Sequence, residues 1–284
     1  MIQCSTKLQK AYLYEANEKG IEIYDFYSQH RMFSDILGYL KGGLIVFVRA
    51  IRPLFFSCEC RNIELYDRLK FLNNMDDKGL HFGKITLFTG LNGSGKTTIL
   101  NIIANKLGIR ESGGSRNFIG NRQTEPEQYA DLFRLVRVAS QREKDAFYFR
   151  ADTFYQTKQF VDDYQLNDYY GVKSMNNFSN GESFMRFVQF RLKDSGVYLF
   201  DEPEAALSPS MQMTLLVEFK RMLDHGCQLI IATHSPILLA YPGAVIYEIN
   251  DSEITQKSYE ETEVFNTYSL FINNHHRMID QLLD

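Results

Sequence analysis

The chain has 284 residues, of which 44% are hydrophobic and 23% are charged. This composition is typical of a globular protein with one large domain, or with one domain and an appendage, and it excludes a low-complexity chain. The net charge of −4 indicates no general affinity for nucleic acid. No apolar run approaches the ~20 residues of a membrane-spanning helix. Because the N-terminus also lacks a signal-peptide pattern, we expect a cytoplasmic protein.

Residues 1–50 contain two β-leaning segments and one segment with helical spacing, and a dense apolar run at 44–51 predicts a buried strand. The three earlier segments occupy residues 11–16, 21–26 and 32–40. We expect residues 1–50 to form an N-terminal extension of unknown role and residues 51–284 to form the main domain.

The strongest signal is the segment Gly90–Thr97, which reads G-x-x-x-x-G-K-T. An apolar strand at 85–88 precedes it, and a helix-patterned stretch at 96–107 follows it. This context disfavours a chance glycine-rich turn. The glycines let the backbone direct N–H groups at one point, and the helix N-terminus adds partial positive charge. The segment therefore predicts a site for a di- or triphosphate.

Within this loop, Lys96 is expected to reach the β- and γ-phosphates, and Thr97 to place its hydroxyl on Mg²⁺. The predicted phosphate-binding residues are consecutive: Asn92, Gly93, Ser94, Gly95, Lys96, Thr97 and Thr98.

The middle of the chain predicts a helix at 127–138 and a strand at 146–151 that ends near Asp152. The pentapeptide Phe-Ser-Asn-Gly-Glu at 178–182 then precedes a predicted helix at 182–193. Serine and glycine at a helix N-terminus form a second anion-binding device, although such a segment is more often an ordinary cap.

Residues 197–200 form a continuously apolar strand, as in a parallel sheet that is buried on both faces. Asp201 and Glu202 follow at its carboxyl end, where ligand crevices of α/β sheets lie. Asp201 fits the role of Mg²⁺ ligand, and Glu202 fits a general base for the attacking water. We expect Glu204 to serve local structure.

The predicted helix that follows begins at the N-cap Ser208 with Pro209 in its first position, and it ends near His225. A buried strand at 228–232 leads directly into Thr233 and His234. This histidine faces the same sheet edge as the two acids, either as a structural hydrogen-bonding group or as a γ-phosphate sensor. A final strand is expected at 244–249 and one or two amphipathic helices at 262–284.

The order of five motifs resembles that of the ATP-binding-cassette (ABC) type of P-loop ATPase. They are Gly90–Thr97, Ser179–Glu182, Leu199–Glu202, Ala205–Ser208 and Thr233–His234. The resemblance covers residues 80–250, and within the group the chain is similar to small stand-alone bacterial ATPases of the AAA family. It implies an α/β fold with a mostly parallel core sheet flanked by helices, an antiparallel β portion, and a short helical subdomain at about 153–195.

The resemblance also implies a mechanism. Two protomers close head-to-tail over two molecules of ATP with Mg²⁺, and each site combines the loop, Asp201, Glu202 and His234 of one chain with Ser179 and Gly181 of the other. Ala205–Ser208 matches the segment that joins the two sites.

The sequence departs from the family pattern at three points. Asn180 stands where the signature has its first glycine, and Glu182 stands where transporters carry glutamine. The loop glutamine that normally senses Mg²⁺ is not identified. Gln123, Gln141, Gln156 and Asp152 are its alternatives.

These features predict an ATP-hydrolysing switch, dimerised by ATP, that acts on a protein or nucleic-acid partner, with phage defence as one setting. The energising subunit of a membrane transporter is one alternative. A non-hydrolysing, ATP-sensing scaffold is the other, and the presence of Glu202 argues against it.

Overall fold

The computed structural model describes residues 46–53, 79–110, 113–115, 130–138, 143–163, 174–192, 195–250 and 253–283. All of them belong to one compact unit that starts at Ile45. The segments expected at 11–16, 21–26 and 32–40 lie outside the described residues. Strand β1 (Val48–Pro53) crosses the expected domain boundary at residue 50, and the separate role of residues 1–50 stays a prediction.

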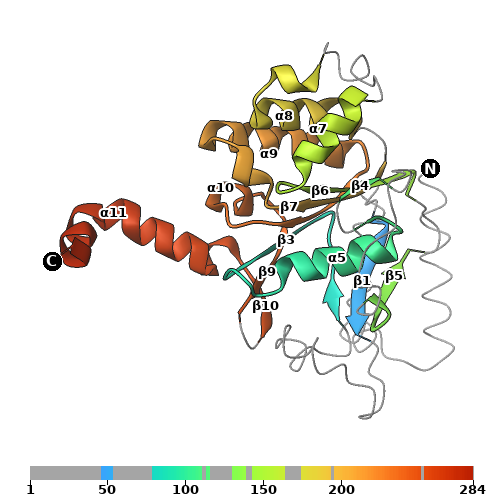
Figure 1. Cartoon of the computed structure of the whole chain (residues 1–284). Coiled ribbons are helices and arrows are strands. Elements are labelled where there is room, and N and C mark those ends of the chain that lie inside the picture. Colours follow the sequence, from blue (N-terminus) through green and yellow to red (C-terminus); the bar gives the residue numbers. More distant parts are fainter. Residues whose placement is uncertain are drawn as a thin grey trace, which may run out of the picture. The chain divides into compact units, whose positions relative to one another are not determined.

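A seven-stranded sheet forms the centre of this unit, in the order β10-β9-β3-β8-β7-β6-β4 (Figure 1). The inner pairings from β9 to β6 are parallel, and β10 and β4 join antiparallel at the two edges. The strands are β3 (Ile85–Gly90), β4 (Gly114–Ser115), β6 (Asp145–Arg150), β7 (Gly196–Asp201), β8 (Gln228–Ala232), β9 (Val245–Ile249) and β10 (Ile254–Lys257).

Helices cover both faces of this sheet (Figure 1). One face carries α5 (Lys96–Lys106). The other carries α7 (Phe154–Asp163), α8 (Asn180–Arg191), α9 (Pro209–Asp224) and α10 (Pro236–Leu239). On β7, Val197 and Leu199 join the core on the α5 side, whereas Tyr198 and Phe200 join the other core. Burial on both faces explains why the inner strands read as continuous apolar runs.

A second, antiparallel sheet has the order β2-β1-β5, with β2 at Leu80–His81 and β5 at Phe133–Arg137. The expected helix at 127–138 is therefore wrong from Phe133 onward. Five residues of β5 pair with β1, and Phe133 packs in the same core as α5. Pairing with a distant strand overrides a local helical pattern, because strand propensity reflects packing against neighbours.

Most other predicted elements are confirmed. Helix α5 is followed by Gly108 with a φ of 77°, and α9 has Ser208 as its N-cap with Pro209 in its first turn. Strand β8 has the predicted bounds. The C-terminal helix α11 (Glu263–Leu283) contains a non-helical residue, Asn274, which divides it into two segments. In the described part of the chain, no helix is long and apolar enough to cross a membrane.

Two buried side chains join the two sheets: Tyr247 of β9, whose hydroxyl bonds to the backbone of His81 in β2, and Gln228 at the start of β8. Gln228 Oε1 accepts the backbone N–H groups of Phe47 and Val48 at 3.0 and 2.9 Å. Its Nε2 donates to the carbonyl oxygens of Val48 and Gly83 at 2.8 and 2.9 Å. Four hydrogen bonds satisfy the amide completely, as a buried polar group requires.

Candidate nucleotide site

The predicted phosphate loop connects the end of β3 to the start of α5. Gly90, Gly93 and Gly95 all have positive φ, at 129°, 79° and 101°. At Gly90 a Cβ atom would lie 1.9 Å from the carbonyl oxygen of Ile249, because β9 pairs with β3 at this position. Only glycine therefore fits the point where the loop leaves the sheet.

The loop encloses the ammonium group of Lys96, whose side chain is buried. Its Nζ donates to the carbonyl oxygens of Gly90 and Leu91 at 3.0 and 2.8 Å. These bonds use two of the three N–H donors, and the third stays free for a phosphate oxygen. Burial lowers the pKa of Lys96, and the nearby carboxylates of Glu202 and Asp201 oppose this shift. The negative charge of a bound phosphate would favour the protonated form of Lys96 and so counteract the effect of burial on its pKa.

Asp201, at the end of β7, contacts the predicted magnesium-binding threonine. The hydroxyl of Thr97 donates to Asp201 Oδ1 at 3.2 Å, and that of Tyr148 donates to Oδ2 at 3.4 Å. Burial raises the pKa of Asp201, although the bond from Thr97 and the charge of Arg150 oppose the shift. A carboxylate and a hydroxyl are hard oxygen ligands, and a divalent cation would offset the buried negative charge, so these residues fit Mg²⁺.

Glu202 has an unusual backbone conformation, with φ 49° and ψ 52°. Among the described residues it is the one non-glycine with positive φ. Its N–H donates to the carbonyl oxygen of Ala232 at 2.9 Å, so the neighbouring strand holds this conformation in place. Non-glycine residues in the left-handed region carry strain and concentrate at functional sites.

His234 lies beside Glu202, with 3.7 Å between its Nε2 and Glu202 Oε1. This buried Nε2 makes no hydrogen bond in the described structure. Burial lowers the pKa of His234, the charge of Lys96 lowers it further, and Glu202 opposes both. The backbone N–H of His234 donates to Glu204 Oε1 at 2.7 Å, so Glu204 positions the histidine loop.

Sheet topology brings these residues together. Strands β3, β8 and β7 are adjacent, and Ala232 aligns with both Phe88 and Asp201. Their carboxyl ends therefore meet at one edge, as the sequence predicted. Five predicted site residues gather there: Lys96, Thr97, Asp201, Glu202 and His234.

The N-terminus of α8 is built as a cap, but it stands apart from the loop. Ser179 Oγ accepts the N–H of Glu182 at 3.2 Å, and Glu182 Oε2 accepts the backbone N–H of Ser179 at 2.9 Å, which completes a capping box. The Ser179 hydroxyl also donates to Glu182 Oε2 at 2.8 Å. No hydrogen bond or ion pair among the described residues links Ser179 or Gly181 to the loop at 90–98. A Cβ on Gly181 would lie 2.6 Å from the carbonyl oxygen of Ala206, so the start of α8 packs on residues 205–208 of its own chain.

The buried Lys158 of α7 supports the same cap. Its Nζ donates to the carbonyl oxygen of Phe178 at 3.1 Å and to Asn180 Oδ1 at 3.3 Å. Asn180, the departure from the signature glycine, thus has a structural partner. The sequence showed no link between residues 158 and 180, because helix α7 gives no local signal of what it packs against.

Sequence reasoning also missed Tyr148 and Arg150 on β6. They lie two residues apart and therefore on the same face of the strand. Arg150 aligns with Asp201 on β7. Arg150 binds Asp152 through Nε and Nη2 at 3.0 and 2.7 Å. Asp152, one alternative for the loop glutamine, is therefore engaged with an arginine, while Gln156 is exposed on α7. Gln123 and Gln141 lie outside the described residues.

A cavity of about 630 Å³ opens beside the loop. Gly90–Asn92 and His234 line one side of it, and the first two turns of α11 line the other, with Glu263 and Tyr268 among them. The sequence did not predict that the C-terminal helix reaches this site.

Comparison with known proteins identifies the same group. The family model described as "ABC transporter" matches residues 77–205. The model described as "AAA domain, putative AbiEii toxin, Type IV TA system" matches residues 184–240. A curated relative from Archaeoglobus fulgidus, named "Probable branched-chain amino acid transport ATP-binding protein LivG", is 24% identical over 232 residues. The alignment covers 70% of this chain and 87% of the relative.

Similar solved structures include a subunit of an ABC transporter complex from Clostridium perfringens, with 14% identity and a TM-score of 0.46. That match covers 84% of this chain and 98% of the subunit. The SMC head domain from Thermotoga maritima has 14% identity and a TM-score of 0.37, over 63% of this chain and 92% of the head domain. On the two family models and the order of motifs along the sheet edge, the chain belongs to the ABC-type P-loop ATPases.

Proposed function

We propose that this protein is a cytoplasmic ATP-hydrolysing switch, which closes head-to-tail as a homodimer around Mg²⁺-ATP and transmits closure to a protein or nucleic-acid partner. The observation that carries the proposal is the state of the polar groups at the loop edge. Four buried side-chain polar atoms in the described structure lack a hydrogen-bond partner: Thr89 Oγ1, Ser94 Oγ, Glu204 Oε2 and His234 Nε2. All four belong to this edge. Buried polar groups rarely stay unpaired, so their concentration points to a polar ligand.

The chemistry follows from the residues present. Lys96 holds the β- and γ-phosphates, with its remaining N–H donor directed to them. The oxygen of a water molecule attacks the γ-phosphorus, the bond to the bridging oxygen of ADP breaks, and Glu202 accepts the proton of the water. His234, which burial keeps neutral, donates or accepts a hydrogen bond at the γ-phosphate beside Glu202.

Thr97 and Asp201 would hold Mg²⁺ at this edge. When bound, the ion supplies positive charge that stabilises the developing charge on the phosphates. The pKa of Asp201, raised by burial, fits this role, because the cation would favour the ionised carboxylate.

The second copy supplies what one chain lacks. In the described structure Ser179 is bonded to Glu182 and not to the loop. We therefore assign Ser179 and Gly181 to the γ-phosphate of the site on the partner copy, where the α8 N-terminus adds its partial positive charge. To bind phosphate, the hydroxyl of Ser179 must turn from Glu182 to the ligand.

Two other functions have specific support. The named relative is a transport ATP-binding protein, which favours the role of energising subunit for a permease. The AAA-domain match carries a toxin description, which favours a role in defence, either as the switch or as an ATP-sensing scaffold. A hydrolysing switch is compatible with both transport and defence. Only the ATP-sensing scaffold requires that Glu202 does not act in hydrolysis.

Sedimentation velocity of the Glu202→Gln protein tests the composite site. With Mg²⁺-ATP this variant should form a stable dimer, because it binds ATP and hydrolyses it at least ~100-fold more slowly. Adding Ser179→Arg should leave ATP binding intact and abolish the dimer, whereas Gln256→Arg, at an exposed position on β10, should not change it. A monomer under saturating ATP, or a dimer that tolerates Ser179→Arg, contradicts the model.

A further inference from the structure

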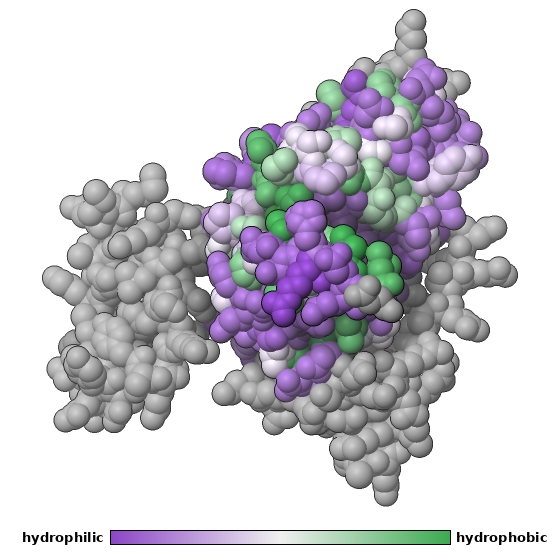
Figure 2. Space-filling view, turned by 90° about the vertical axis from the view of Figure 1, so that its left-hand side faces the viewer, coloured by the Kyte–Doolittle hydropathy of each residue, from purple (hydrophilic) through white to green (hydrophobic). Residues whose placement is uncertain are grey.

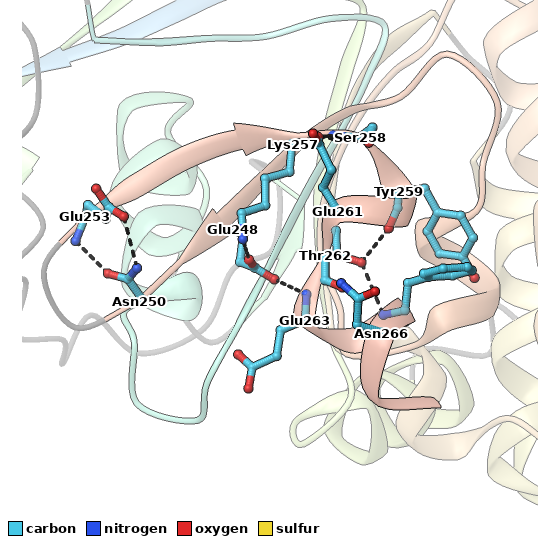
Figure 3. Close-up of polar contacts among 11 residues, drawn as sticks. Glu248, Asn250, Glu253, Lys257, Ser258, Tyr259, Glu261, Thr262, Glu263 and Asn266 are labelled. Carbon is cyan, nitrogen blue, oxygen red and sulfur yellow. Dashed lines mark hydrogen bonds and ion pairs between the residues drawn. The ribbon is translucent and has the colours of Figure 1, made fainter. Parts of the chain in front are cut away.

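The C-terminal helix α11 is firmly attached at its first turn. The backbone N–H of Glu263 donates to Glu248 Oε1 at 2.7 Å, and Lys257 pairs with the other oxygen of this buried carboxylate. The Thr262 hydroxyl accepts the N–H of Phe265 at 3.2 Å and donates to the carbonyl oxygen of Tyr259 at 2.7 Å (Figure 3). Glu248 lies on β9, next to β3. The start of α11 is therefore fixed to the strand beside the phosphate loop.

Beyond this anchor the helix is exposed on all sides, and none of its residues is buried. It projects away from the sheet and its covering helices (Figure 1). Each of its two segments nevertheless exposes apolar side chains, with Ile272 66% exposed before the break at Asn274 and Leu282 75% exposed after it. We call these two side chains, together with Tyr268, Phe271, Ile279 and Leu283, the apolar face of α11. The opposite side carries Asn266, Asn273, Arg277 and Asp280, together with one exposed apolar residue, Leu270.

The described part of the chain does not explain such a helix. In proteins, most helical stability comes from packing of the apolar face, and contiguous exposed apolar surface marks an interaction site. The anchor orders the first turns, but from Tyr268 onward nothing in the described structure covers the apolar face. The remaining question is which surface buries it.

The position of the helix favours a second copy of this chain. Its first two turns line the same cavity as Asn92 and His234. The proposed dimer brings the α8 N-terminus of the second copy to that loop. Helix α11 therefore starts at the margin of that contact and extends outward from it.

A matching apolar surface exists on α9. Met213 and Val217, one helical turn apart, are 55% and 67% exposed. Helix α9 starts directly after Ala205–Ser208, the segment that the proposed dimer places between the two sites. Figure 2 faces the side from which α11 projects and shows hydrophobic residues between hydrophilic ones on this side of the molecule. In a two-fold dimer each copy can offer both the arm and the surface that receives it.

We propose that α11 is a dimerisation arm whose apolar face packs on Met213 and Val217 of a second copy when ATP closes the dimer. This inference rests on the proposed function, because the arm is argued from the ATP-dependent interface. It adds a contact outside the nucleotide site that stabilises the closed state and is broken on reopening.

The test uses the full-length Glu202→Gln protein, whose ATP-bound dimer is the reference. Ile272→Glu should raise the dimer dissociation constant by about tenfold or more, since it places a charge in an apolar contact. Asn273→Glu puts the same charge one residue away on the polar face and should change the constant less than about twofold. Sedimentation velocity gives the constant, and a fluorescent ATP analogue should bind both variants equally.

The outcomes separate the two proposals. If the Glu202→Gln protein does not dimerise with ATP, the proposed function fails first. If it dimerises and Ile272→Glu dimerises equally well, the arm alone is overturned. A dimer that depends on α11 but forms without ATP also overturns the proposed arm. So does an Ile272→Glu protein that dimerises normally but no longer binds some other protein.

Cross-linking tests the receiving surface. One tagged copy carries Ile272→Cys and a differently tagged copy carries Val217→Cys, both with Cys4, Cys58 and Cys60 replaced by serine. A short bismaleimide should join the two tags with Mg²⁺-ATP and not without it. Ser269→Cys in place of Ile272→Cys should cross-link far less. Equal yields with and without ATP would contradict the proposed contact.

Discussion

The two ends of strand β8 treat buried polar groups in opposite ways. At its start, Gln228 has every donor and acceptor satisfied within the chain, by four hydrogen bonds to β1 and the segment before β3. Just beyond its other end, His234 keeps a buried nitrogen without a hydrogen-bond partner. Both residues flank one short strand, so the contrast does not reflect different parts of the core.

The contrast separates a part of the fold that serves stability from the part where we propose that a ligand binds. Satisfied buried groups rigidify a structure, while unsatisfied ones cost stability and persist where a ligand completes them. The loop edge also contains the strained backbone of Glu202 and the buried charges of Lys96 and Asp201, with their pKa values shifted by burial. No comparable group lies among the described contacts of Gln228.

Replacing Lys96 with alanine should affect ATP binding most strongly. It removes charge-assisted hydrogen bonds to two phosphates, each worth about 1.5–3 kcal/mol, so ATP affinity should fall by roughly 100-fold or more. Folding stability should not fall, because a buried cation with unfavourable desolvation is lost. Isothermal titration with ATP gives the affinity. Lys106→Ala, in the last turn of the same helix, is the matched control and should bind as the unaltered protein does.

Replacing Gln228 with alanine should produce the opposite pattern. Two backbone N–H groups and two carbonyl oxygens lose their partner in a buried seam, so the free energy of unfolding should fall by about 2–4 kcal/mol. Urea unfolding measures the change, with Gln256→Ala on the exposed edge of β10 as the control. ATP affinity of the folded fraction should stay within about twofold. A much smaller loss of unfolding free energy would mean that the hydrogen bonds of Gln228 do not hold the two sheets together.

The position of the residues at the loop edge could be predicted from the sequence, whereas the hydrogen bonds of Gln228 between the two sheets could not. The glycines and the lysine of the loop act through local backbone geometry, and the carboxyl ends of apolar strands mark a sheet edge. Short-range patterns therefore placed Asp201, Glu202 and His234 correctly at this edge. Gln228 bonds to residues about 180 positions away, and β5 is a strand because of β1. Such contacts leave no trace in local periodicity.

Two further contacts, those of Glu204 and of helix α11, could not be predicted for the same reason. Glu204 looked like local structure, yet its carboxylate holds the backbone of His234, 30 residues further on. Helix α11 was expected as an amphipathic helix, but its place beside the loop depends on the buried carboxylate of Glu248. In both cases the residue type was informative, while the partner was set by the topology of the sheet.

Asp201→Asn should change stability only slightly. Burial raises the pKa of this carboxyl, so the folded state binds its proton more tightly than the unfolded state does. Its ionised form therefore costs stability at neutral pH, and this cost disappears as the pH falls through the raised pKa. The substituted amide would keep the bond from Thr97 without the charge, and the melting temperature of the ligand-free protein at pH 7 should rise by roughly 1–3 °C.

With Mg²⁺-ATP the order of the two melting temperatures should reverse, because Mg²⁺ should stabilise only the unaltered protein. Scanning calorimetry over a series of pH values, with and without Mg²⁺-ATP, measures both effects: the gain from Asp201→Asn should shrink as the pH falls through the raised pKa of Asp201. A variant that is less stable than the unaltered protein without ligand would show that Asp201 serves the fold, as Gln228 does, and the division between the two ends of β8 would fail.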